Sequence, residues 1–143
     1  MTDLLGPQPL RDDRLTLLAG DAPDLGVISA LMQDAIVRAG DVGWDRRHRR
    51  LVLIASRFCW ETTTPSRVRT ALRLETAQKV ERQRWPTDPD TVLALLSVSA
   101  EDDRISLVLA DGVCLRVTTE CIDVVLEDLS PPWPVRHRPH HTD

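Results

Sequence analysis

Residues 105–118 read ISLVLADGVCLRVT, two alternating apolar runs that meet at Asp111-Gly112. Alternation is typical of a strand with one buried face, and Asp-Gly between two such runs predicts a β-hairpin. A two-residue turn would place an arginine among the apolar side chains. A three-residue turn that includes Ala110 instead pairs Leu107 with Leu115, so register logic favours it. Six apolar side chains then share one face: Ile105, Leu107, Leu109, Val113, Leu115 and Val117. Gly112 then takes the left-handed position of the turn.

Further strands are expected on the N-terminal side of this hairpin. Residues 51–60 are apolar on both faces in their first half, which predicts a central strand covered on both sides. Residues 75–85 are polar and leave strand and helix open. Other short apolar or alternating runs predict strands near residues 15–18, 35–38, 68–74 and 92–99.

Two helices are expected. Asp21-Ala22-Pro23-Asp24 is typical of a helix start, and the apolar spacing that follows predicts a helix over about residues 22–32. In residues 120–129, apolar side chains recur at i, i+3, i+4 and i+7, which predicts a second helix. A strand stays open there, because Val124 and Val125 are β-branched.

The element order predicts an α+β fold. We expect six to eight mostly antiparallel strands that form a roll or partly open barrel, with one N-terminal and one C-terminal helix. A PH-like roll satisfies this order, because its C-terminal helix plugs the barrel. The globular domain is expected to span residues 14–133, between a flexible arm at residues 1–13 and a flexible tail at residues 134–143.

Composition narrows the functional classes. The chain has 143 residues and a net charge of −4, which disfavours a general nucleic-acid binder. Its three cysteines form no CxxC pair, which is typical of reduced thiols in a cytoplasmic protein. No apolar run has the length of a signal peptide or a membrane span, so we expect no membrane association.

Two groups of residues are candidates for binding. Arg46-Arg47-His48-Arg49-Arg50 is a strongly basic run whose arginines predict an anion site for phosphate or a nucleic-acid backbone. The alternative is a solvated turn whose charges keep a strand edge soluble. All four tryptophans, Trp44, Trp60, Trp85 and Trp133, flank predicted elements, where an indole either covers the core or anchors a partner. Trp44, Trp60 and Trp133 are the candidates for partner binding.

Catalytic signatures are missing from the sequence. It contains no GxSxG, HExxH or Gly-rich phosphate-loop motif. Cys59, Cys114 and Cys121 would need a positioned base to act as nucleophiles, and three of the four histidines lie in the expected tail. We predict no catalytic residue, metal or cofactor. Four carboxylates that would converge around the central strand remain a catalytic alternative: Asp34, Asp41, Asp45 and Glu61.

Three segments together resemble a known family. They are residues 24–35 (DLGVISALMQDA), residues 57–61 (RFCWE), and residues 120–133, which include Glu120-Cys121-Ile122-Asp123 and Trp133. Their order and spacing are similar to a bacterial family of unknown function, DUF2948, over about residues 15–133. The resemblance implies a cytoplasmic setting and assigns no activity or site residue.

Three functional hypotheses follow. The leading one is a non-catalytic module that binds a protein or peptide partner, with a homodimer as one form of it. The second is an anion or nucleic-acid binder that uses the arginine run. The third is an enzyme that uses clustered carboxylates.

Overall fold

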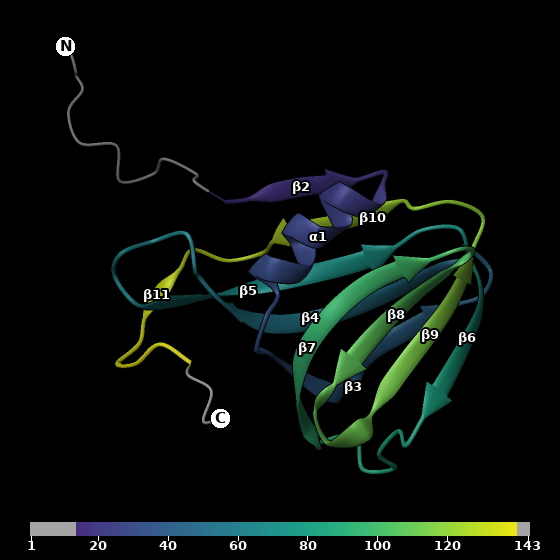
Figure 1. The fold of residues 1–143 in the computed structure, drawn as a ribbon. Helices are drawn as coiled ribbons and strands as arrows, with labels where there is room; N and C mark the ends of the chain where they lie inside the picture. Colours follow the sequence, from purple (N-terminus) through teal and green to yellow (C-terminus); the bar gives the residue numbers. More distant parts are fainter. Residues whose placement is uncertain (1–13, 140–143) are drawn as a thin grey trace.

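The computed structural model describes residues 14–139, and the predicted arm at residues 1–13 lies outside them. Its ten strands form one antiparallel sheet, joined by one α-helix and one 3₁₀ turn (Figure 1). The strands are β2 (Thr16–Ala19), β3 (Ala35–Asp45), β4 (Arg50–Phe58), β5 (Ser66–Leu74), β6 (Ala77–Gln83), β7 (Val92–Glu101), β8 (Arg104–Leu109), β9 (Cys114–Thr119), β10 (Val124–Asp128) and β11 (Trp133–Pro134). The helix is α1 (Ala22–Leu31), and the turn is η1 (Ala110–Gly112).

The sheet is open and strongly curled. Its strand order is β2-β10-β5-β4-β3-β7-β8-β9-β6, with β11 paired to β5. The prediction of a mostly antiparallel sheet is therefore confirmed, and β4 lies centrally, as expected. Its second face is not fully covered, because Val52 and Ile54 are only half-buried. In Figure 1, β7, β8, β9 and β6 turn away from the layer formed by β10, β5 and β4, so that β6 comes round towards β3.

The β8–β9 hairpin has the predicted register. Leu107 pairs with Leu115, and the Leu109 N–H donates to the Val113 carbonyl at 2.8 Å, which closes a three-residue turn. Gly112 has φ +77°, the left-handed conformation that glycine adopts without strain. Six apolar side chains of the hairpin consequently enter one core: Ile105, Leu107, Leu109, Val113, Leu115 and Val117.

Helix α1 forms where the sequence predicts it. The Asp21 carboxylate accepts the Asp24 N–H at 2.9 Å as N-cap, and a proline occupies the first turn. Leu25 and Ile28 are buried against the sheet, and the Ser29 hydroxyl accepts the Val98 N–H at 2.9 Å. The helix thus covers the inner face of the sheet between β2 and β7 (Figure 1).

The predicted C-terminal helix is wrong. Residues 124–128 form strand β10, which pairs on one side with β2 and on the other with β5. Val124, Val125 and Leu126 are all buried, so the strand is apolar on both faces, and its pattern coincides with helical spacing. Two sets of ladder hydrogen bonds and two β-branched side chains favour the strand. No helix therefore exists here to plug the sheet as in a PH-like roll.

The ten strands exceed the six to eight expected, because β6, β10 and β11 add to the predicted ones. Strand β3 continues from the expected short run to Asp45, with an irregularity between Val37 and Val42. The ambiguous polar stretch contains β6, which pairs with β9. No helix within residues 14–139 is long and apolar enough to cross a membrane. The domain boundaries at residues 14 and 133 remain a prediction.

Candidate functional site

The predicted anion site lies in the turn between β3 and β4. Arg49 donates to Glu120 at 2.9 Å, and Arg50 donates to Glu75 at 2.9 Å. Arg46 and Arg47 are exposed, and no ion pair joins them to an acid in the described part of the chain. Two of the four predicted anion ligands are therefore already neutralised.

The three predicted partner-binding tryptophans do not gather at one place. Trp60 packs edge-on against Phe58, with ring centroids 4.6 Å apart, and its indole N–H donates to the Gln33 carbonyl at 3.2 Å. Trp133 lies on β11 and is 40% exposed. Trp44 lies on β3, half-buried against the core. Only Trp44 among them lines one of the hollows described below.

Three of the four candidate carboxylates bind different side chains. Asp41 accepts Arg38 at 2.9 Å, and Asp45 accepts His48 at 2.8 Å, which lowers the pKa of Asp45. Glu61 binds Arg57. The fourth, Asp34, lies in the turn between α1 and β3. Over residues 14–139, no group of three His, Cys, Asp or Glu side chains is arranged to hold a metal ion.

Cys59 is the only fully buried cysteine of the three. Burial raises the pKa of its thiol, which holds it in the protonated form at neutral pH. The thiolate is the nucleophilic form of cysteine, so this environment does not activate Cys59.

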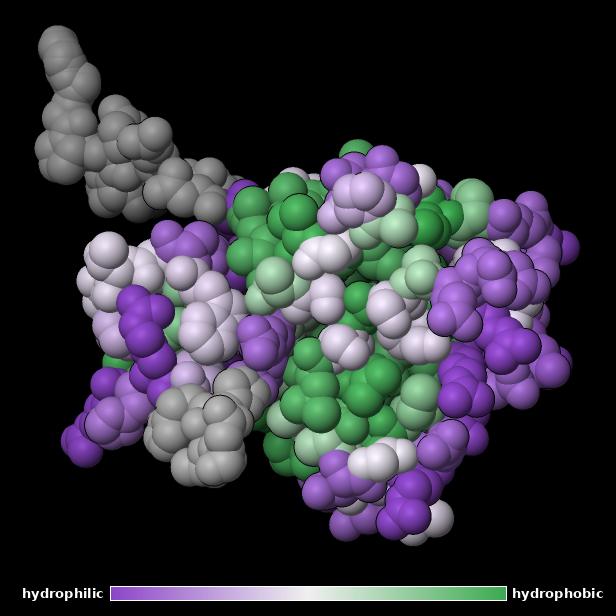
Figure 2. Space-filling view, viewed as in Figure 1, coloured by the Kyte–Doolittle hydropathy of each residue, from purple (hydrophilic) through white to green (hydrophobic). Residues whose placement is uncertain are grey.

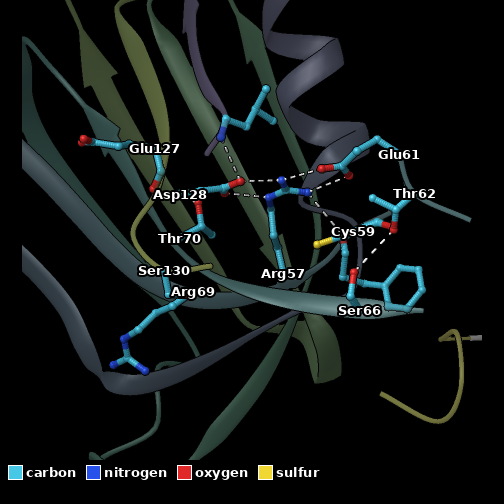
Figure 3. Close-up of polar contacts among 12 residues, drawn as sticks. Arg57, Cys59, Glu61, Thr62, Ser66, Arg69, Thr70, Glu127, Asp128 and Ser130 are labelled. Carbon is cyan, nitrogen blue, oxygen red and sulfur yellow. Dashed lines mark hydrogen bonds and ion pairs between the residues drawn. The ribbon is translucent and has the colours of Figure 1, made fainter. Parts of the chain in front are cut away.

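Arg57 is the centre of a buried charge cluster (Figure 3). It lies on the inner face of β4, fully buried, and reaches two carboxylates. Its Nε and Nη2 donate to Asp128 of β10 at 2.9 and 2.7 Å. Its Nη1 and Nη2 donate to Glu61, in the loop after β4, at 3.0 and 2.8 Å. Nη1 also contacts the Phe58 carbonyl at 3.5 Å.

These contacts use all five N–H donors of the Arg57 guanidinium. Burial by itself would lower the pKa of Arg57, but hydrogen bonds and charge attraction from Asp128 and Glu61 outweigh it and raise that pKa. The Asp128 carboxylate also accepts the Leu15 N–H at 3.4 Å, just before β2. With no donor left for a ligand, the cluster acts as a structural clasp between β4, β10 and the following loop.

The loop at residues 59–65 is tied to the C-terminal segment. The Thr62 hydroxyl donates to the Cys59 and Thr64 carbonyls at 3.1 and 2.9 Å. Arg138 donates to the carbonyls of Thr62 and Thr63, both at 3.1 Å, and its guanidinium lies over the Phe58 ring at 5.4 Å. The described part of the expected tail thus contacts the domain, and its flexibility remains a prediction.

A hollow of about 80 Å³ lies between β3 and β6, which are not neighbours in the hydrogen-bonded sheet. We call it the β3–β6 groove. Arg82 of β6 contributes a guanidinium to its wall. Two indoles and four aliphatic side chains form the rest: Trp44, Trp85, Val42, Leu51, Val80 and Leu115.

The groove is closed at one end and extends at the other. The Ala77 N–H, at the start of β6, donates to the Arg49 carbonyl at 2.8 Å beside the β3–β4 turn. At the far end, Trp85 also lines a shallower hollow of about 470 Å³ with Arg84 and Leu93. Trp85 therefore lies between two adjoining depressions.

The segment that carries Trp85 is fixed to β3. Arg38 donates to Asp90 at 2.8 Å, and the Gly40 N–H donates to the Pro89 carbonyl at 2.8 Å. A Cβ on Gly40 would lie 3.0 Å from the Pro89 side chain, so glycine permits this close approach. The wall of the groove is therefore held in place by defined contacts.

Sequence reasoning noted Trp85 at the end of an element without choosing it as a site residue, and it missed Arg82. Both lie in or just after the polar stretch that left strand and helix open, so the inner face of β6 was not assigned. The only local signal was the position of Trp85 directly before Pro86.

Two other surface features are present. A polar hollow of about 460 Å³ at the β7–β8 turn is lined by opposed charges that include Glu101, Asp103, Arg104 and Arg116. Figure 2 shows an apolar patch where β7 and β8 approach η1. On strands β7 and β8, Leu96 is 41% and Val108 is 38% exposed.

Comparison with known proteins gives a family and no activity. No curated protein and no solved structure matches the chain. One family model, described as a protein of unknown function (DUF2948), matches residues 15–141. Because this match covers nearly the whole chain, the resemblance of the three sequence segments is confirmed, and the chain belongs to the DUF2948 family.

Proposed function

We propose that this protein is a non-catalytic binding module that holds an apolar side chain of a partner protein in the β3–β6 groove. The observation that carries the proposal is the composition of the groove at a place where two strand edges have no pairing strand within residues 14–139. Trp44, Trp85 and Val80 line a hollow whose only cationic wall residue is Arg82. Aromatic pockets of this kind are where protein interfaces concentrate binding energy.

The size of the groove favours a protein partner over a free small molecule. Pockets for small molecules typically enclose about 300–1,000 Å³. The groove holds about 80 Å³, which suits a single side chain. The shallower hollow beyond Trp85 supplies further contact surface next to that anchor point.

The buried charges support a binding role over catalysis. The donors of Arg57 are all used by Asp128, Glu61 and the Phe58 carbonyl. Three of the four carboxylates named as a catalytic alternative bind different side chains of the protein itself. Groups that are satisfied internally in this way stabilise a fold and are not directed at a substrate.

Selection of peptides from a random displayed library on the full chain tests the proposal, followed by calorimetric titration of a selected synthetic peptide. Val80→Glu places a charge in the groove and should weaken binding at least about tenfold. Val108→Glu, on an exposed β8 position, is the matched control and should bind as the unchanged protein does. Circular dichroism checks that both variants fold. Failure to select any peptide, or equal affinity for both variants, would contradict the proposal.

Anion binding at the β3–β4 turn is the second candidate, because Arg46 and Arg47 are exposed and have no acid partner in the described chain. Oligonucleotide binding measured against salt tests it. If these arginines contact phosphates, replacing both with glutamine should reduce the salt slope by about one for each lost contact. An unchanged slope would exclude the turn as the anion site.

A further inference from the structure

We propose that the segment bound in the groove is an extended strand that pairs with the free edge of β6 and carries acidic residues two positions from its apolar anchor. This inference rests on the proposed function above and adds the binding mode and the chemical class of the partner.

The first argument is the unpaired edge. Strand β6 ends the hydrogen-bonded order of the sheet, and in the described chain only β9 pairs with it. Residues 42–45 of β3, across the groove, pair only with β4 within the same part of the chain. Alternate residues of an edge strand direct N–H and C=O groups away from the sheet, and an extended peptide satisfies these groups by adding a strand.

The second argument is the spacing of side chains on β6. Val80 pairs with Val117, and Arg82 pairs with Leu115. Val117 and Leu115 are buried in the core, so Val80 and Arg82 lie on the inner face of β6. Side chains of an added strand alternate between faces with a period of two residues. A residue beside Val80 therefore enters the groove, and one two positions away lies beside Arg82.

The third argument is charge. Arg82 and Arg84 are exposed, and no ion pair with an acid is formed by either of them in residues 14–139. Lys79 of the same strand lies 3.8 Å from Glu81. Charged side chains on an edge strand ordinarily prevent pairing with other chains. The charged side chains without an ion pair on β6 and just after it, Arg82 and Arg84, are positive, whereas Asp111 of η1 lines only the adjoining shallower hollow. The edge of β6 therefore repels basic strands and accepts acidic ones.

Fluorescence polarisation with labelled synthetic peptides and the full chain tests the inference. The probe is Thr-Glu-Thr-Leu-Thr-Glu-Thr, which reads the same in both directions, so the orientation of the added strand does not matter. The matched control replaces both glutamates with lysine. Two further peptides carry backbone N-methyl groups. One is methylated on the leucine and both glutamates, whose side chains share a face, and the other is methylated on the alternating threonines.

The acidic probe should bind at least about tenfold more tightly than the lysine peptide, and Arg82→Glu should reverse this preference. One N-methylated set should lose at least about tenfold in affinity, while the other set retains it, because alternate N–H groups of a strand point to opposite sides. Equal binding of both N-methylated peptides overturns strand addition. If Val80→Glu still abolishes binding of the acidic probe in that case, the proposed function stands and only the binding mode fails.

Discussion

At the scale of single residues, Arg57 joins β4 to the loop directly after it and to the distant strand β10. Its partner Asp128 lies 71 positions along the sequence, and both side chains are almost fully buried. The ion pair with Asp128 is worth little as a net gain, because removing both charges from water costs several kcal/mol. The pair matters for stability because the loss of one partner leaves the other charge buried without a counter-charge.

Arg57→Met should lower the free energy of unfolding by about 3–5 kcal/mol, because it leaves the Asp128 carboxylate buried without a counter-charge. Urea denaturation followed by circular dichroism measures this loss. Arg57→Met combined with Asp128→Leu should recover most of it, since no buried charge then remains. Arg69→Ala, an exposed neighbour on β5, is the control and should change stability by less than about 0.5 kcal/mol. A single Arg57 variant as stable as the control would show that the clasp has no structural role.

Glu61 should make the stability of the protein depend on pH in the acidic range. Hydrogen bonds from Arg57 lower the pKa of Glu61 below its usual value. A carboxyl group whose folded pKa is lowered stabilises the fold above its unfolded pKa, about 4.3, and loses that contribution as pH falls through the folded value. The free energy of unfolding should therefore fall on acidification below about pH 4.3.

Glu61→Gln should remove part of that decrease, which urea midpoints measured at a series of pH values would show. The comparison variant is Glu127→Gln on β10, an exposed position. If the pH profile of Glu61→Gln matches that of the unchanged protein, the contact with Arg57 does not stabilise the ionised form.

At the scale of elements, the spacing of apolar residues predicts a strand and its register correctly where only one face of the strand is buried. The alternating side chains of residues 105–118 predicted the β8–β9 register, because a one-residue slip would expose the whole apolar set. The same reasoning failed for residues 124–128, where both faces are buried. Three consecutive apolar side chains there fit helical and extended spacing equally, and only pairing with β2 and β5 selects the strand.

Gly112→Ala should destabilise the β8–β9 hairpin. The residue has φ +77°, and an added Cβ would lie 3.2 Å from Cδ of Arg84. Left-handed backbone costs a residue with a side chain roughly 1–2 kcal/mol, so the free energy of unfolding should fall by about that amount. Thermal and urea unfolding measure the change.

Gly43→Ala is the matched glycine control, because nothing lies within 4 Å of its added Cβ and its φ is not positive. Its stability should stay within about 0.5 kcal/mol of the unchanged protein. Equal effects at the two positions would mean that the turn does not require a left-handed residue at Gly112.

At the scale of the whole molecule, the curl of the sheet creates the groove, and this could not be predicted from sequence. Trp44 was identifiable as a candidate from its position beside the basic turn. Its neighbours Val80, Arg82 and Trp85 come from a segment about 40 residues away that reads as polar and ambiguous. They meet only because five strands, β3-β7-β8-β9-β6, turn round one core.

The four tryptophans provide an internal test of where a partner binds. Trp44 and Trp85 line the groove, whereas Trp60 contacts Phe58 and Gln33, and Trp133 lies on β11. Each indole N–H gives a separate NMR signal that a single Trp→Phe variant assigns. The groove can therefore be compared with two reference sites in the same molecule.

The most direct measurement is a titration of the ¹⁵N-labelled protein with the acidic peptide Thr-Glu-Thr-Leu-Thr-Glu-Thr, followed by these four indole signals. A partner segment held between β3 and β6 should shift the signals of Trp44 and Trp85 and leave those of Trp60 and Trp133 unchanged. Shifts confined to Trp60 or Trp133, or no shift at any indole at saturating peptide, would contradict a binding site in the β3–β6 groove.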